Sequence, residues 1–174
     1  MEYDVVIVGG GPSGLTTAIK LKQLNSNLNI CVLEKASEIG AHILSGNVFE
    51  TRALDELIPN WKDLNPPIKT KVTKEKFLFL GKTKSLSWPT WLLPAVQKNH
   101  KNYIISLANL CRWLAEQAEA LGVEIFPGFP ASEILYNDDG SVKGVATQDM
   151  GLDKEGNKKD SYEPGIDLIG KVTV

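Results

Sequence analysis

The chain has 174 residues, of which 43% are apolar and 23% are charged, and these values are typical of a soluble globular protein. Its net charge of -2 gives no electrostatic basis for binding nucleic acid. No apolar run approaches the ~20 residues that span a bilayer. Because the first predicted strand already begins at Tyr3, we expect no signal or transit peptide, and a bacterial protein on the cytoplasmic side.

The opening of the chain has the pattern of a βαβ dinucleotide-binding unit. Residues 5–8, Val-Val-Ile-Val, predict a strand buried on both faces of a parallel sheet. Residues 13–24 predict a helix, and residues 29–33 predict a second apolar strand that ends on Glu34.

Three glycines between the first strand and the helix have the spacing G-x-G-x-x-G. Gly9 permits a tight turn, Gly11 lets the backbone approach a pyrophosphate, and Gly14 lets the helix pack closely on the strand. The carboxylate of Glu34 can accept hydrogen bonds from a ribose diol and would repel a ribose phosphate. We therefore predict a dinucleotide whose adenosine lacks a 2′-phosphate, with its diphosphate on free amides of the helix.

The segment after Glu34 departs from the simple alternation of strands and helices. Residues 36–47 are small and polar and include Gly40 and Gly46, which favours a loop held near a ligand over an ordinary surface loop. A nicotinamide-binding domain would continue with another βαβ unit here. The early departure therefore indicates an FAD domain.

The middle of the chain predicts short elements. Residues 51–58 predict a helix with Thr51 as its N-cap, and residues 72–80 and 83–88 predict the two strands of a hairpin. Residues 88–94, Trp-Pro-Thr-Trp-Leu-Leu-Pro, are too rich in proline for a helix. Three interpretations of this segment stay open: it lines a pocket for an apolar substrate, it touches a membrane surface, or it packs against the rest of the protein.

Residues 104–121 predict a long helix with one core-facing apolar stripe, which begins at Ile104, and Gly122 as its stop. Trp113 falls on the opposite side of this helix. It either contacts protein outside this chain or lies flat on its own helix.

The last third of the chain predicts strands. Residues 123–126 predict a third parallel strand, and residues 132–137 and 141–147 a hairpin. Residues 154–157 predict another hairpin tip. Residues 170–174 enter an apolar strand without a cap or polar tail, so we expect the N-terminal piece of a larger protein.

The cysteines and histidines predict no catalytic or metal-binding set. Cys31 and Cys111 fall inside predicted elements and are expected to be small core residues, and two cysteines are too few for an iron–sulfur cluster. His42 and His100 have no evident carboxylate partner nearby in the sequence. If the protein is an enzyme, its cofactor carries the chemistry.

With these residues placed, the chain resembles the electron-transfer flavoprotein:ubiquinone oxidoreductase family over almost its whole length. The resemblance rests on VVIVGGGPSGL at residues 5–15, EKASEIGAHILSG at 34–46, the polar run at 99–104, EQAEALGVEIFPGF at 116–129 and DDGSVKGVAT at 138–147. The first motif is shared by many flavoproteins, whereas GAHILSG together with EQAEALGVE and DDGSVKGV is much narrower.

The resemblance implies an α/β fold, namely a Rossmann-like FAD-binding domain of the glutathione-reductase type with an inserted β-rich segment. Residues 47–103 would be the insertion and would contribute to a quinone or substrate domain. The implied enzyme is a flavoprotein dehydrogenase that passes electrons from reduced electron-transfer flavoprotein to ubiquinone. It would carry FAD and a 4Fe-4S cluster whose ligands lie beyond this chain, so the chain alone is expected to be inactive.

The resemblance also implies a location and a cofactor site. The whole protein would bind peripherally to the cytoplasmic face of the bacterial inner membrane, whereas a fragment would be soluble. The implied cofactor-binding residues are Gly9, Gly11, Pro12, Ser13, Gly14, Glu34, Lys35, Gly40, Ala41, His42, Leu44, Ser45, Gly46 and, near the adenine, Ile134. Two alternatives stay open: a geranylgeranyl-reductase-like or hydroxylase-like FAD enzyme acting on an apolar substrate, and a non-catalytic FAD-binding module.

Overall fold

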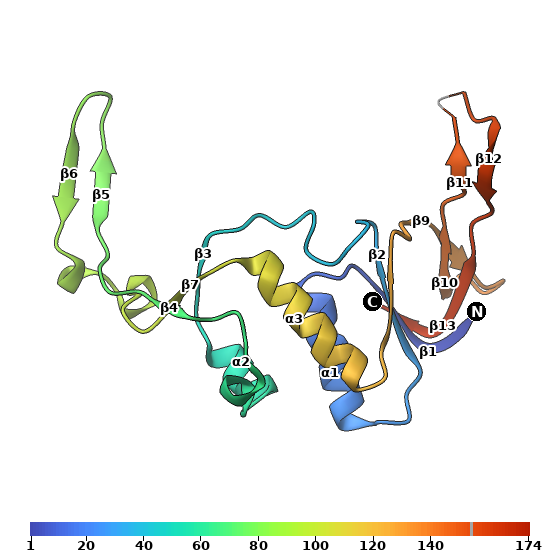
Figure 1. Cartoon of the computed structure of the whole chain (residues 1–174), viewed down its shortest axis with the longest axis horizontal. Coiled ribbons are helices and arrows are strands. Elements are labelled where there is room, and N and C mark those ends of the chain that lie inside the picture. The colour runs from blue at the N-terminus through green and yellow to red at the C-terminus, as the bar shows by residue number, and fades with distance from the viewer. Residues whose placement is uncertain (154) are drawn as a thin grey trace. The chain divides into compact units, whose positions relative to one another are not determined.

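The computed structural model describes residues 1–153 and 155–174 and divides the chain into two compact units. The first unit comprises Met1–Ile43 with Cys111–Val174, and the second comprises Leu44–Leu110. Figure 1 shows the course of the chain through their helices and strands. Within the described residues, no helix combines the length and the apolar character that crossing a membrane requires.

The first unit is built on a six-stranded sheet in the order β8-β2-β1-β13-β10-β9. The strands β8, β2, β1 and β13 run parallel, whereas β10 and β9 are antiparallel to their neighbours. The elements of this unit are β1 (Glu2–Val8), α1 (Pro12–Leu24), β2 (Ile30–Glu34), β8 (Glu124–Pro127), β9 (Ala131–Tyr136), β10 (Val142–Thr147), β11 (Met150–Leu152), β12 (Lys158–Glu163) and β13 (Asp167–Thr173). The helix α3 (Leu107–Ala120) begins in the second unit and continues into the first.

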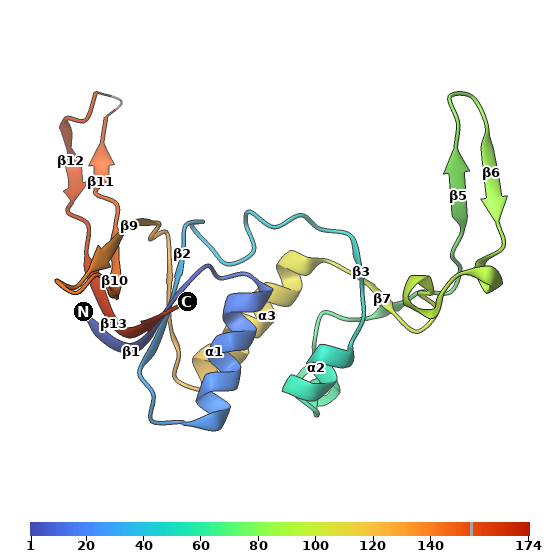
Figure 2. The same ribbon diagram turned by 180° about the vertical axis from the view of Figure 1, so that it is seen from behind.

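The parallel strands are covered on both faces. Figures 1 and 2 both show α1 and α3 on one side of β1 and β2, and the antiparallel end of the same sheet, β10 and β9, on the other. The helix α1 turns Leu15, Ala18 and Ile19 into the core. A second buried cluster joins the parallel strands β1, β2 and β13 to the antiparallel strand β10 of the same sheet and comprises Tyr3, Val6, Cys31, Leu33, Val145 and Leu168. Burial on both faces explains why β1 and β2 read as continuous apolar runs.

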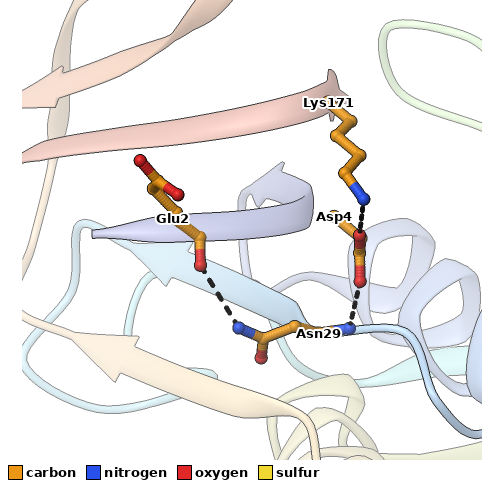
Figure 3. Close-up of polar contacts among 4 residues, drawn as sticks. All are labelled: Glu2, Asp4, Asn29 and Lys171. Carbon is orange, nitrogen blue, oxygen red and sulfur yellow. Dashed lines mark hydrogen bonds and ion pairs between the residues drawn. The ribbon is translucent and has the colours of Figure 1, made fainter.

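Polar contacts connect the starts of β1 and β2 to the second half of β13, as Figure 3 shows. The carboxylate of Asp4 on β1 accepts hydrogen bonds from the Asn29 backbone amide (2.7 Å) and from the Lys171 ammonium group (2.6 Å). The Asn29 side-chain amide donates to the carbonyl oxygen of Glu2 at 3.2 Å. One carboxylate therefore ties β1 to β13 and to the segment that enters β2.

Most elements predicted for this unit are confirmed. The βαβ unit, the third parallel strand and the hairpin β9–β10 lie where the sequence predicts them. The hairpin β11–β12 is also present, although Lys154, in its predicted tip, lies outside the described residues. Cys31 and Cys111 are buried core residues, and burial raises the pKa of their thiols to about 12 and about 11.

The second unit contains short elements around a three-stranded sheet in the order β3-β7-β4, with a separate hairpin β5–β6. Its strands are β3 (Asn47–Phe49), β4 (Thr70–Lys71), β5 (Phe77–Leu80), β6 (Ser85–Trp88) and β7 (Tyr103–Ile105). Its helix is α2 (Arg52–Leu57), and 3₁₀ turns cover Trp61–Leu64, Thr90–Leu92 and Ala95–Gln97.

Two details of the second unit correct the sequence-based prediction. The first hairpin strand begins at Phe77 rather than at Val72, because Val72 instead donates its backbone N–H to the Asn102 carbonyl oxygen. Thr51 precedes α2 as predicted but does not cap its backbone; its hydroxyl donates to the Asp55 carboxylate at 2.9 Å.

The predicted helix at residues 104–121 is wrong at its start and in its buried face. Ile104 lies in β7, paired with Val48 on β3, because this run of β-branched residues favours a strand. Ser106 then caps α3, accepting a hydrogen bond from the Asn109 amide at 3.3 Å. Trp113 is only 5% exposed, so the helix buries a wider arc than the predicted stripe.

Candidate functional site

The turn between β1 and α1 has the geometry that its glycines predict. Gly9 has φ of +114°, a backbone conformation that residues other than glycine rarely adopt. A Cβ atom on Gly14 would overlap the carbonyl oxygen of Gly9 and would lie 3.2 Å from Ile7 Cγ2. A Cβ atom on Gly11 would meet nothing within 4 Å. Gly9 and Gly14 are therefore required by the fold itself, whereas Gly11 leaves open space beside the helix start.

The start of α1 is suited to an anion. Gly11 is its N-cap residue and Pro12 occupies the first turn, where proline's missing N–H costs no helical hydrogen bond. Among the described residues, no side chain caps this end and no acidic residue lies in the first turn. The amides of the first turn and the helix dipole thus face the open space at Gly11, where a phosphate would be favoured.

Glu34 is held in place by two backbone amides. Its Oε2 atom accepts a hydrogen bond from the Gly10 N–H at 2.9 Å, and its Oε1 atom accepts one from the Ala36 N–H at 2.8 Å. The carboxylate at the end of β2 is thereby fixed against the glycine turn. Each oxygen keeps a lone pair that can accept a ribose hydroxyl.

Gly10 is a site residue that the sequence analysis missed. A Cβ atom there would overlap Ile39 Cδ1 and would lie 3.2 Å from Glu34 Cβ. Glycine at this position therefore lets both Ile39 and Glu34 pack closely against the turn. The signal was present as the middle glycine of Gly9-Gly10-Gly11, a position that the G-x-G-x-x-G pattern leaves free.

The loop after β2 lies partly in the first unit. Lys35, Ala41 and His42 are exposed, whereas Gly40 is buried and has φ of +86°. Arg112 on α3 forms an ion pair with Glu38 in this loop, with Nη2 and Oε1 separated by 3.1 Å. The loop is thus attached to α3 a few residues before Gly40.

The remaining predicted site residues lie elsewhere. Leu44, Ser45 and Gly46 belong to the second unit and are exposed, Leu44 by 91%. Ile134 is half exposed on β9, paired with Val145 of β10. Its strand lies four places from β2 in the sheet order, and its contact with an adenine stays a prediction.

The second unit has two surface features of opposite character. A hollow of about 740 Å³ is lined by charged residues, including Arg52, Asp55 and Lys101, and its lining does not resemble an apolar pocket. The hairpin β5–β6 instead exposes an aromatic face. Phe79 packs edge to face against Phe77 and Trp88, with ring centroids 5.4 and 5.9 Å apart.

The comparisons with known proteins agree with this geometry. Residues 7–69 match the family described as NAD(P)-binding Rossmann-like domain. The chain is 53% identical to the mitochondrial electron transfer flavoprotein-ubiquinone oxidoreductase of Oryza sativa subsp. japonica, covering 100% of this chain and 30% of that protein. The enzyme of the same name from Pseudomonas aeruginosa is 52% identical, with 100% and 33% covered. The chain therefore spans about a third of the length of these curated relatives.

Solved structures from other protein families share the fold. A geranylgeranyl bacteriochlorophyll reductase-like protein from Thermoplasma acidophilum aligns with a TM-score of 0.66 at 22% identity, covering 99% of this chain and 38% of that one. The myxobacterial FAD-dependent halogenase CndH aligns with a TM-score of 0.61 at 16% identity, with 99% and 36% covered. These likenesses establish the α/β Rossmann-like fold, with its parallel sheet, that the sequence predicted.

Proposed function

Because the whole chain is homologous to the N-terminal part of electron transfer flavoprotein-ubiquinone oxidoreductases, we propose that its first unit binds FAD. The observation that carries this proposal is the pairing of Glu34 with the Gly10 and Ala36 amides beside the open space at Gly11. A ribose diol on Glu34 and a diphosphate at the start of α1 are the two ends of one adenosine diphosphate.

In this proposal each part of the site has a separate task. Gly11, Ser13 and Gly14 present backbone amides to the diphosphate, and Pro12 orients the first turn. Glu34 accepts the ribose hydroxyls, and its fixed charge disfavours a 2′-phosphate. Lys35, Ala41 and His42, with Leu44 to Gly46, follow the cofactor toward its flavin. FAD supplies the redox chemistry, and these residues bind it and orient it.

For the whole protein we propose electron transfer from reduced electron-transfer flavoprotein to ubiquinone, the partners in the names of the relatives. A 4Fe-4S cluster would be held by residues outside this chain. The insertion at residues 47–103 would form part of the quinone domain. The likeness to the geranylgeranyl reductase-like protein, at 22% identity, concerns the fold alone and does not favour its reaction here.

We further propose peripheral membrane contact through the second unit, at the cytoplasmic face of a bacterial inner membrane. The hairpin β5–β6 and the turn after it expose Phe79 by 53%, Leu86 by 65% and Trp91 by 74%. A two-stranded hairpin of this kind is barely stable in water by itself, and large apolar side chains on it favour a covering surface.

The decisive test of cofactor binding compares FAD with NAD on the purified chain. We expect FAD to bind, and its flavin fluorescence to be quenched on binding. Gly11→Ala should weaken FAD binding at least tenfold and leave the melting temperature of the protein unchanged. Saturable binding of NAD with no uptake of FAD would contradict the flavoprotein assignment. Equal FAD affinity in Gly11→Ala would contradict the placement of the diphosphate.

A further inference from the structure

The charge of the chain is distributed unevenly along its length. Residues 65–103 contain eight lysines and a single acidic residue, Glu75. The rest of the chain carries eleven Lys and Arg against twenty Asp and Glu. A strongly basic segment therefore lies within an otherwise acidic protein, and it is the segment that contains the hairpin β5–β6.

The lysines stand at both ends of the hairpin rather than along its strands. Lys74 and Lys76 precede β5, and Lys82 and Lys84 lie in the turn between β5 and β6. All four are exposed. Each strand has four residues, so the two lysine pairs lie ~13 Å apart along the hairpin.

The apolar side chains lie between these two pairs. In the register of the hairpin, Phe77 faces Trp88 and Phe79 faces Leu86. Because neighbouring residues of a strand alternate between faces, these four side chains share one face. The edge-to-face contacts of Phe79 with Phe77 and Trp88 agree with that placement.

This arrangement disfavours insertion of the hairpin tip into the hydrocarbon of a bilayer. Two lysines at the tip would have to enter an apolar medium, at several kcal/mol each near the bilayer centre. If the hairpin instead lies flat, the aromatic face enters the interface and the lysines at both ends reach lipid headgroups. Lysine adds binding energy at a headgroup layer when that layer is negatively charged.

Resting on the membrane contact proposed above, we propose that the hairpin β5–β6 lies flat on the membrane and selects anionic phospholipids through Lys74, Lys76, Lys82 and Lys84. The aromatic face supplies binding to any bilayer, and the lysines supply the preference for negative headgroups. An acidic protein surface would attract the same four lysines as an anionic membrane. The exposed aromatic face between the lysines favours the membrane, because this face enters the bilayer interface.

The test measures binding of the full chain, loaded with FAD, to vesicles of phosphatidylcholine alone and of phosphatidylcholine mixed with phosphatidylglycerol. We expect tighter binding to the mixed vesicles, and a preference that weakens as salt rises. Lys82→Gln with Lys84→Gln should lower affinity for mixed vesicles about 25-fold, or about fivefold per lysine, and leave phosphatidylcholine binding unchanged. Phe79→Ala should weaken binding to both.

The matched control removes two lysines from the first unit. Lys20→Gln with Lys159→Gln changes the net charge equally, at exposed positions on α1 and β12. We expect vesicle binding of this control to equal that of the unsubstituted chain. An equal loss in both double variants, or equal affinity for the two vesicle types, would overturn the proposal.

Two further readouts separate the remaining outcomes. Brominated lipid should quench tryptophan fluorescence, and a decrease of this quenching in Trp88→Phe supports a flat hairpin in the interface. Displacement from mixed vesicles by polyglutamate without any such quenching would assign the lysines to an acidic protein and overturn the lipid partner. FAD content reports separately on the flavin site, so loss of lipid selection with FAD retained contradicts this inference alone.

Discussion

The parallel sheet of the first unit buries its apolar side chains, whereas the hairpin of the second unit exposes them. Val6, Cys31 and Val32 on β1 and β2 are fully buried, whereas Phe79 and Leu80 on β5 are 53% and 79% exposed. Both segments read as short apolar strands in the sequence. Burial on two faces stabilises the fold, whereas the exposed residues of the hairpin form the surface for which we propose membrane contact.

Charge separates the same two regions. The second unit, residues 44–110, carries ten Lys and Arg against five Asp and Glu, whereas the first unit carries nine against sixteen. The overall charge of -2 conceals this difference. Net charge alone therefore gave no indication of the basic hairpin.

The largest contrast is expected from truncating one apolar side chain in each region. Leu33→Ala on β2 removes a side chain that is 2% exposed, and should lower the free energy of unfolding by ~2–5 kcal/mol. Phe79→Ala on the hairpin should lower it by less than ~1 kcal/mol, because the ring is already half in water. Urea denaturation of both variants checks this. Similar losses would mean that the hairpin is part of a folded core.

Within the first unit, two glycines should separate stability from cofactor binding. Gly14→Ala places a methyl group against the Gly9 carbonyl and should cost ~1–3 kcal/mol of stability as well as FAD affinity. Gly11→Ala, in open space, should cost FAD affinity alone. Thermal melting and FAD titration measured on the same samples make the comparison. An unaltered melting temperature in Gly14→Ala would show that α1 can shift from β1.

The carboxylate of Glu34 is expected to have an intermediate effect. Glu34→Gln keeps one acceptor oxygen and turns its amide group toward a backbone N–H, so one of the two hydrogen bonds is lost. Hydrogen bonds to charged groups are worth ~1.5–3 kcal/mol, which predicts a 10- to 100-fold weaker FAD affinity. Calorimetric titration with FAD and with FMN provides the control, because FMN lacks the adenosine and should bind both proteins equally.

The smallest predicted effect concerns pH. The Lys171 ammonium group, with the Asn29 amide, lowers the pKa of the Asp4 carboxyl. A carboxyl group whose pKa is lower in the folded state stabilises the fold above its unfolded pKa of ~3.9 and loses that contribution as pH falls through the folded value. Asp4→Asn should therefore flatten the dependence of stability on pH below about 4.

The matched comparison for Asp4→Asn is Asp160→Asn on β12, an exposed position in a separate hairpin. Chemical denaturation over a series of acidic pH values gives the two curves. If both variants give curves of the same shape, the contact with Lys171 contributes nothing to acid sensitivity.

The sequence was informative where local chemistry decides the structure. The glycine turn, the βαβ unit and the Asp-Gly hairpin follow from spacing and turn residues, so they were predicted with bounds close to those observed. Gly10 was missed because the close contacts there come from Glu34 and Ile39, which lie beyond the helix that follows the turn. A single-sequence motif cannot contain such a contact.

Errors arose where pairing between distant segments overrides a local pattern. Ile104 continues the helical spacing of α3, yet strands β3 and β4 on either side draw it into a sheet. Trp113 was expected on the polar side of the helix and is buried instead. The two-unit arrangement, with α3 beginning in one and continuing in the other, is likewise set by contacts that periodicity does not encode.

The pairing of β1 with β13 has a consequence for how the chain folds. Glu2 pairs with Ile169 and Val6 with Thr173, so the centre of the sheet joins segments more than 160 residues apart in the chain. During synthesis on a ribosome β1 emerges early, but its second neighbour, β13, is synthesised more than 160 residues later. Loop-closure entropy opposes that step, and topologies rich in such distant pairings fold slowly. During this delay an apolar strand has an unpaired edge, and a chaperone that shields it would raise the folded yield.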